Sequence, residues 1–297
     1  MSGPPRLFDR TLLDARRRRA LRGTTVGADF LLRIVADDLL DRLAAVKRTF
    51  DLAVDIGSPL PLIAVRLATG GQVGRVIRID RLEETRPDIV GDQEALPLAP
   101  ASIDLAVSAL ALHWSDDFPG VLAQIRRALK PDGLFLAALL GGETLTELRQ
   151  SMAAAEAEIT GGASPRVAPF AELRAAGALL QRAGFALPVI DQDRRIVRYD
   201  SALHLMHDLR AMGATNVLIE RSRRPMPRRM LARATEIYAE RFSDADGRIR
   251  ATFDLISLSG WAPHESQQQP LRPGSAKARL ADALKATERP AGEKAGN

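Results

Sequence analysis

Between residues 50 and 140 the sequence alternates short apolar runs with segments of helical periodicity, and few folds accommodate that alternation. Strands of a parallel sheet are buried on both faces and are joined by crossover helices, so they produce this pattern. We therefore predict an α/β fold with a doubly wound, mostly parallel sheet of Rossmann-like connectivity. The predicted strands of this part are 52–56, 76–79, 88–90, 103–110 and 134–140.

Outside this stretch the apolar spacing predicts one helix before the sheet and a mixed extension after it. These elements are helices over 29–49, 144–159, 171–182, 201–212 (with Ser201 as N-cap) and 230–242, a pair of strands at 187–190 and 196–199, and a last strand at 252–258. We divide the chain into a basic N-terminal arm (1–28), an α/β domain (29–262) and a partly disordered C-terminal tail (263–297). The domain includes a helical elaboration at about 201–245.

Composition excludes several classes of protein. The chain has no cysteine, so it has no disulfide, thiolate metal site or cysteine nucleophile. No apolar run is long enough to span a membrane and no secretory signal is present, so we expect a cytoplasmic protein. Arginines gather in 6–22 and in 221–229. Such clusters suit nucleic acid, acidic lipid, an acidic protein face or plain solvent, and the lack of interleaved aromatics argues against nucleic acid.

Polar residues follow the predicted strands at the edge where doubly wound sheets bind ligands. Asp80 suits the two hydroxyls of a ribose, and Asp92 suits an adenine amino group. Each of these residues alone could simply cap a helix, but their order and spacing together indicate a nucleotide-like cofactor. The expected cofactor-binding residues are Asp55, Gly57, Asp80, Asp92, Gln93 and Ser108.

Further segments are more distinctive than this general pattern. The broader motifs are Asp55-Ile-Gly57, Asp80, Gly91-Asp92 with Leu96-Pro97, Phe118-Pro119 and Arg127-Ala-Leu-Lys-Pro-Asp-Gly133. The narrower ones are Phe8-Asp-Arg10, Ser108-Ala-Leu-Ala-Leu-His-Trp114, Gly141-Gly-Glu-Thr-Leu-Thr-Glu-Leu-Arg149, Arg182-Ala-Gly-Phe185 and Gly260-Trp-Ala-Pro-His-Glu-Ser-Gln267 with Pro273-Gly-Ser275. The first set is similar to the motifs of class I S-adenosylmethionine (SAM) methyltransferases. Within that superfamily the chain resembles the complex I assembly factor 5 group, which is related to the malonyl-carrier-protein methyltransferases of biotin synthesis.

The resemblance implies a SAM-binding enzyme of methyltransferase fold that acts on a protein during assembly of respiratory complex I. It further implies hydroxylation of an arginine in the iron–sulfur subunit, a reaction that the fold itself does not predict. Two other functions stay open. One is a complex I assembly chaperone without a cofactor, and the other is a methyltransferase acting on a small carboxylate.

The chain departs from the family pattern in the loop after the first strand. The pattern D-x-G-x-G-x-G reads here Asp55-Ile-Gly57-Ser58-Pro59-Leu60-Pro61, so prolines replace two glycines. Proline has no N–H and fixes φ near −65°, which weakens cofactor binding at this loop. Alternatively, Pro61 only begins the next helix, a position that favours proline.

The histidines give no metal site by their spacing. His113, His204, His207 and His264 form no H-x-D/E triplet, and His204 with His207 is typical of a helix surface. His113 and Trp114 follow the fourth strand, where methyltransferases place substrate-facing residues. The alternative is that Trp114 packs against the edge of the sheet.

Overall fold

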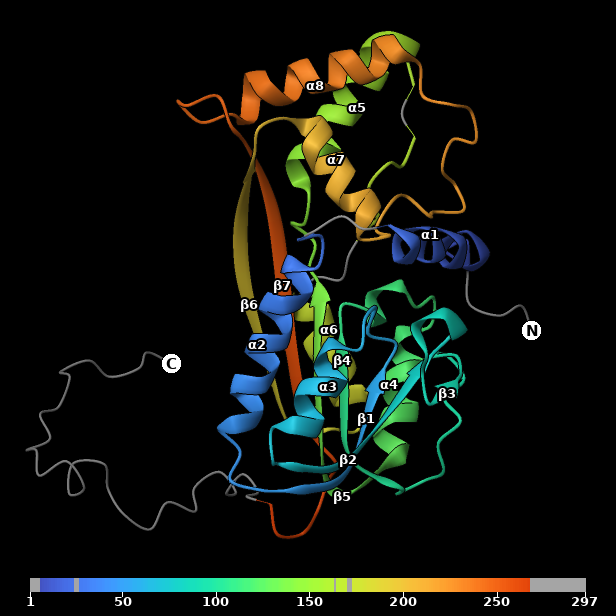
Figure 1. Ribbon diagram of the computed structural model, residues 1–297, viewed down its shortest axis with the longest axis vertical. Coiled ribbons are helices and arrows are strands. Elements are labelled where there is room, and N and C mark those ends of the chain that lie inside the picture. Colours follow the sequence, from blue (N-terminus) through green and yellow to red (C-terminus); the bar gives the residue numbers. More distant parts are fainter. Residues whose placement is uncertain (1–5, 24–26, 163, 170–172, 268–297) are drawn as a thin grey trace, which may run out of the picture. The chain divides into compact units, whose positions relative to one another are not determined.

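The computed structural model describes residues 6–23, 27–162, 164–169 and 173–267 of the 297-residue chain. Within residues 1–263, which form one unit, the central element is a seven-stranded sheet of order β3-β2-β1-β4-β5-β7-β6. The five strands of the predicted alternating segment are parallel, and β7 is antiparallel to both its neighbours. The strands are β1 (Phe50–Ile56), β2 (Val73–Asp80), β3 (Ile89–Val90), β4 (Ile103–Ala109), β5 (Leu129–Leu140), β6 (Ala186–Tyr199) and β7 (Ile249–Trp261). The predicted doubly wound α/β fold is confirmed (Figure 1).

Helices cover both faces of the sheet. The described α-helices are α1 (Arg10–Arg22), α2 (Phe30–Ala44), α3 (Leu62–Thr69), α4 (Phe118–Ala128), α5 (Thr146–Thr160), α6 (Leu173–Arg182), α7 (Ala202–Ala211) and α8 (Arg228–Phe242). Buried residues of α2 and α3 share one apolar cluster, and those of α4 and α6 share another on the opposite face. No described helix has the length and apolar character needed to cross a bilayer. The predicted tail beyond residue 267 lies outside the described residues.

Strand β5 shows why an uninterrupted apolar run predicts a central strand. Successive side chains of a strand point to opposite faces of its sheet. Leu134, Leu136 and Ala138 therefore belong to the cluster on the α2 and α3 face, whereas Phe135 and Ala137 belong to the cluster beneath α4 and α6. Because both faces are covered, no polar residue is tolerated in this part of the strand.

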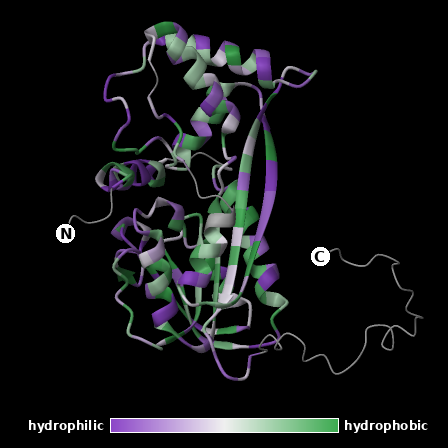
Figure 2. Ribbon diagram, turned by 180° about the vertical axis from the view of Figure 1, so that it is seen from behind, coloured by the Kyte–Doolittle hydropathy of each residue, from purple (hydrophilic) through white to green (hydrophobic). Residues whose placement is uncertain are grey.

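The two short strands predicted at 187–190 and 196–199 are wrong, because the structure has one continuous strand, β6. Residues 191–195 are polar and exposed, which broke the apolar pattern of the sequence. Strand β6 is an edge of the sheet, and its backbone pairs with β7 from Ala186 to Tyr199. Main-chain pairing at an edge needs no apolar side chains, so polar residues remain in the strand. The middle of this ribbon accordingly has hydrophilic colours (Figure 2).

Helices α5, α7 and α8 gather at the far end of the β6–β7 ribbon (Figure 1). Ser201 caps α7 as predicted, and its hydroxyl accepts a hydrogen bond from the His204 backbone N–H at 3.3 Å. A buried polar contact joins α5 to β7, since the Glu147 carboxylate accepts from both the backbone N–H of Thr252 (3.1 Å) and its hydroxyl. Both residues are buried, so this carboxylate satisfies two donors away from water.

Replacing Glu147 tests that contact. Glu147→Ala is expected to lower the free energy of unfolding by about 2–3 kcal/mol, because it leaves two buried Thr252 donors without an acceptor. Urea denaturation measures the change. The matched control is Glu143→Ala, an exposed residue of the same type four positions earlier, which should change the free energy by less than about 0.5 kcal/mol. Equal effects of the two substitutions would remove Glu147 as a stabilising contact.

Candidate functional site

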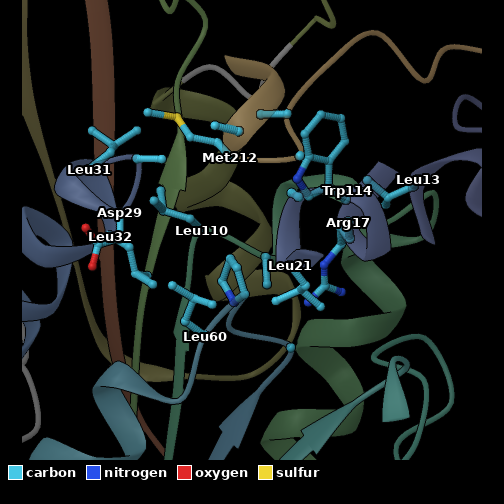
Figure 3. Close-up of a pocket in the computed structure, with 18 of the residues that line it drawn as sticks. Leu13, Arg17, Leu21, Asp29, Leu31, Leu32, Leu60, Leu110, Trp114 and Met212 are labelled. Atoms are coloured by element: carbon cyan, nitrogen blue, oxygen red, sulfur yellow. The ribbon is translucent and has the colours of Figure 1, made fainter. Parts of the chain in front are cut away.

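A cavity of about 490 Å³ lies beyond the carboxyl ends of β1 and β4, where a doubly wound sheet binds its ligands. Its volume is within the range of small-molecule and cofactor sites. The sheet side is formed by Gly57, Pro59 and Leu60 after β1 and by Leu110 and Ala111 after β4. The opposite walls come from α1, the first turn of α2 and the segment that ends α7 (Figure 3).

The loop after β1 turns sharply into this cavity at Gly57. Its φ is +72°, a backbone conformation that favours glycine, and a Cβ there would lie 2.7 Å from Oε1 of Gln93, so that side chain would have to shift. Pro61 is the N-cap of α3, in agreement with the interpretation that it begins this helix. Pro59 lines the cavity. Pro59 and Pro61 have no backbone N–H to donate. The backbone N–H of Gly57 already donates to the Ile79 carbonyl at 2.8 Å. A ligand therefore has fewer backbone donors here than the glycine-rich family loop provides.

Asp55 lies beneath this loop and is not one of the cavity's lining residues. Its carboxylate accepts a hydrogen bond from the Ser58 hydroxyl and faces Nε of Arg78 at 3.4 Å. Burial raises the pKa of Asp55 to about 6 and outweighs the Ser58 hydrogen bond and the Arg78 charge, which both lower it. In this arrangement Asp55 fixes the turn rather than presenting its carboxylate to a ligand.

Asp80, at the end of β2, is almost fully buried and is engaged by a helix that precedes the sheet in sequence. Arg17 of α1 donates to both carboxylate oxygens of Asp80, at 3.1 and 2.7 Å. The backbone N–H of Leu82 donates to Asp80 as well, at 3.0 Å. The two guanidinium donors thus occupy the acceptor positions that the sequence assigned to ribose hydroxyls.

Asp92, after β3, belongs to a second set of ion pairs that reach α1. It accepts from Arg10 of α1 and lies 3.5 Å from Arg81, which in turn contacts Asp14 of α1 at 2.7 Å. Arg10 also contacts Glu94 at 2.7 Å. Burial raises the pKa of Asp92, but the hydrogen bonds and positive charges around it prevail and lower it overall. The carboxylates predicted to bind adenosine are therefore neutralised by the chain's own arginines.

Gln93 and Ser108 have different surroundings. Gln93 lines the cavity, and its Nε2 donates to the Ser115 hydroxyl at 2.9 Å. Ser108 is fully buried within β4, and its hydroxyl donates to the Ile56 carbonyl of β1 at 2.7 Å. Of the predicted cofactor residues, only Gly57 and Gln93 line the cavity, while Asp80 and Asp92 lie behind the arginines of α1.

His113 and Trp114 both line the cavity, in the short helix that follows β4. Burial lowers the pKa of His113 to about 3, so its ring is uncharged at neutral pH and does not repel a cationic ligand. The Trp114 ring packs edge-to-face on the buried Phe8 ring, with centroids 5.3 Å apart. Trp114 thus packs against Phe8 and also borders the cavity. Within the described part of the chain, no His, Asp and Glu residues are grouped to hold a metal.

Helix α1 contributes functional candidates that the sequence reading missed. Arg10, Asp14 and Arg17 line the cavity from one face of this helix. Their spacing of four and three residues places them on a single face, which is the signal that helical periodicity offered. The sequence leaves the partners of these arginines open, because the carboxylates that Arg10 and Arg17 contact are more than 60 residues away in the sequence.

The pH dependence of stability tests the burial of Asp55. Between its unfolded pKa of about 3.9 and its folded value, the folded state holds a proton that the unfolded state releases, so stability falls as pH rises. The unfolding free energy of the wild type minus that of Asp55→Asn should therefore drop by on the order of 2–3 kcal/mol from about pH 4 to pH 6. Urea titrations at a series of pH values measure it. A constant or rising difference would mean that Asp55 is ionised in the folded state.

Comparisons with known proteins agree with this architecture. A family model described as a methyltransferase domain matches residues 54–137. A solved putative methyltransferase from Bacillus halodurans is 15% identical with a TM-score of 0.53, covering 77% of this chain and 99% of that one. The YcgJ protein from Bacillus subtilis is 16% identical with a TM-score of 0.51, with the same coverage of both chains. These two likenesses concern the fold.

Curated relatives are similar over most of the chain. The arginine-hydroxylase NDUFAF5 of Danio rerio is 38% identical over 267 residues, which cover 86% of this chain and 83% of that protein. Human NDUFAF5 is 37% identical over 91% of this chain and 81% of its own length. A malonyl-[acyl-carrier protein] O-methyltransferase from Methylovorus is 33% identical over 81% of this chain and 85% of its own length. The chain therefore belongs to the arginine-hydroxylase NDUFAF5 family, the complex I assembly factor 5 group of proteins with the class I methyltransferase fold.

Proposed function

We propose that this protein is an enzyme that binds SAM in the cavity at the sheet edge and acts on an arginine of a protein during assembly of respiratory complex I. The proposed substrate is the iron–sulfur subunit, and the proposed location is the bacterial cytoplasm. The names of the NDUFAF5 relatives, which state an arginine-hydroxylase, support the substrate class. Their similarity covers 91% of this chain in the human relative.

The observation that carries the proposal is an unsatisfied carboxylate oxygen in the cavity wall. Asp14 lines the cavity, and its Oδ2 contacts Arg81, whereas its buried Oδ1 has no hydrogen-bond partner among the described residues. A buried acceptor without a donor is unfavourable, so the site is suited to a ligand that brings a positive group or an N–H. The guanidinium of an arginine and the sulfonium of SAM both have positive charge.

The residues present fit an adenosyl group on the condition that Arg17 releases the Asp80 carboxylate. Gly57 gives close access to the backbone, Gln93 offers a side-chain amide, and Asp80 would accept from the ribose once Arg17 releases it. When bound, SAM supplies an electrophilic methyl group on a positively charged sulfur. The apolar side chains of Leu60 and Leu110 in the cavity wall would limit the access of water to a bound ligand, which would strengthen the electrostatic attraction of Asp14 for a cation.

A second candidate function is a complex I assembly chaperone that has kept the fold and lost the cofactor. The specific observation in its favour is that Arg17 and Arg10 already neutralise the two carboxylates expected to bind adenosine. Pro59 and Pro61 lack backbone N–H groups, so the loop has fewer donors for a cofactor, which also favours the chaperone. Calorimetry with SAM separates the two candidates.

Arg17→Gln is expected to tighten SAM binding, because the ligand no longer has to displace a guanidinium from Asp80. Asp80→Asn should weaken it by about ten-fold or more, since the amide is a poorer acceptor for two hydroxyls. The matched control is Arg18→Gln, which breaks only the exposed pair with Glu84 and should leave the affinity unchanged. Isothermal titration calorimetry measures the affinities, and circular dichroism checks that each variant is folded.

Absence of heat and of a thermal shift at millimolar SAM, both in the wild type and in Arg17→Gln, would exclude the enzymatic proposal and favour the chaperone. Equal affinity of Asp80→Asn and wild type would remove Asp80 from the site while leaving SAM binding itself established.

The protein substrate is tested by mass spectrometry of the complex I iron–sulfur subunit from a strain that lacks this protein. If the reaction is hydroxylation, one arginine should lose the mass of an oxygen atom relative to the wild-type strain. That oxygen would have to come from an external oxidant, because SAM carries a transferable methyl group and no transferable oxygen. Complementation with the wild-type chain should restore the mass, and complementation with Asp80→Asn should restore it less completely. An unchanged arginine mass in the deletion strain would rule out hydroxylation of that subunit.

A further inference from the structure

Helix α1 has a second set of arginines that its ion pairs with the sheet do not use. Arg10, Arg17 and Arg18 contact carboxylates at the sheet edge. In contrast, Arg16 and Arg19 have no carboxylate at ion-pair distance among the residues that the structure describes, and the Arg16 guanidinium donates to the neutral Thr215 hydroxyl at 2.6 Å. Most of the α1 ribbon has hydrophilic colours in Figure 2. This helix therefore carries more positive charge than the neighbouring carboxylates neutralise.

Arginines from two other segments join this group. Burial and the nearby positive charges of Arg221, Arg19 and Arg210 lower the pKa of Arg16. Arg223 is close enough to influence Asp9, the acid that pairs with Arg221 at 3.0 Å. We call these five residues the arginine cluster: Arg16, Arg19, Arg210, Arg221 and Arg223. Among the described residues, Asp9 is the one carboxylate that forms an ion pair with the arginine cluster, through Arg221. The remaining positive charges of the cluster lie together without a carboxylate partner, which costs free energy unless an anionic partner binds.

The arginine cluster adjoins the cavity. Ala20 and Leu21 follow Arg19 in α1, and residues 211–214 follow Arg210 at the end of α7; both segments line the cavity. The two segments are closely packed, since a Cβ at Gly213 would lie 3.3 Å from Cα of Arg17. One side of the α1–α7 junction thus faces the cavity, whereas Arg19 and Arg210, which belong to the same two helices, are exposed.

We propose that the arginine cluster binds an acidic segment of the protein substrate, next to the residue that enters the cavity. This inference rests on the proposed function for the identity of the partner. Guanidinium groups bind carboxylates through two parallel hydrogen bonds, which suits Asp and Glu side chains. The large hydrophobic side chains that are exposed among the described residues include no aromatic ring on which a nucleic acid base could stack. The segments that carry Arg19 and Arg210 also line the cavity, so a substrate chain whose arginine occupies the cavity lies within reach of the arginine cluster.

The test uses the full-length protein and a fluorescein-labelled hexaglutamate peptide, with binding measured by fluorescence anisotropy. The variant Arg19→Gln/Arg210→Gln/Arg223→Gln neutralises three exposed members of the arginine cluster. The control variant Arg75→Gln/Arg127→Gln/Arg194→Gln removes the same charge from exposed arginines elsewhere. We expect the first variant to bind the peptide about ten-fold more weakly than the wild type and the control to bind as the wild type does.

Equal peptide affinities of the two variants would overturn the inference. So would binding of oligothymidine or of phosphatidylglycerol vesicles that depends on the arginine cluster while hexaglutamate does not bind. SAM titrations of the same proteins distinguish this inference from the proposed function. The cluster variant should bind SAM as the wild type does, and a wild type that binds hexaglutamate but not SAM would count against the enzymatic proposal only.

Discussion

Two guanidinium–carboxylate contacts, Arg17 with Asp80 and Arg10 with Asp92, join the first helix to the edge of the sheet. Together with the apolar packing of Phe8 and Leu13, they hold α1 over the carboxyl ends of β1 and β4, where it forms a wall of the cavity. Asp80 is almost fully buried, so removal of its partner would leave a charge in a poorly solvated place, at a cost of roughly 3–5 kcal/mol. The same contacts place positive charge where a cofactor would bind, so the closure of the cavity and its occupation are coupled.

Much of the fold could be predicted because the central strands are buried on both faces. Leu134 to Leu140 can form only an inner strand, and the flanking helices follow from the need to cover it. The middle of β6 could not be predicted in this way. Its polar residues resemble a turn, and only the partner strand β7, more than 50 residues away, supplies the hydrogen bonds that extend it. An edge strand is less buried than an inner strand, so its sequence lacks the apolar pattern from which a strand can be predicted.

The candidate site could be predicted in part, for a related reason. Position along the sheet edge was enough to find Gly57 and Gln93 in the cavity wall. The sequence could not reveal that Asp55 points under its own loop or that Ser108 bridges two strands, because side-chain direction depends on packing. The sequence also could not show which arginines of α1 form ion pairs at the sheet edge and which ones face outward, because all of them carry the same charge. That division depends on which arginines the folded chain brings to the carboxylates at the sheet edge.

Strand β6 ends the sheet with a row of main-chain groups that no further strand covers among the residues that the structure describes. Such a row is a template for pairing with another polypeptide, and natural proteins commonly protect it with charged side chains. Asp191, Asp193 and Arg195 provide that protection here, since they are exposed along the middle of the strand. These charges disfavour the pairing of β6 with an edge strand of another molecule, and so disfavour polymerisation through the sheet.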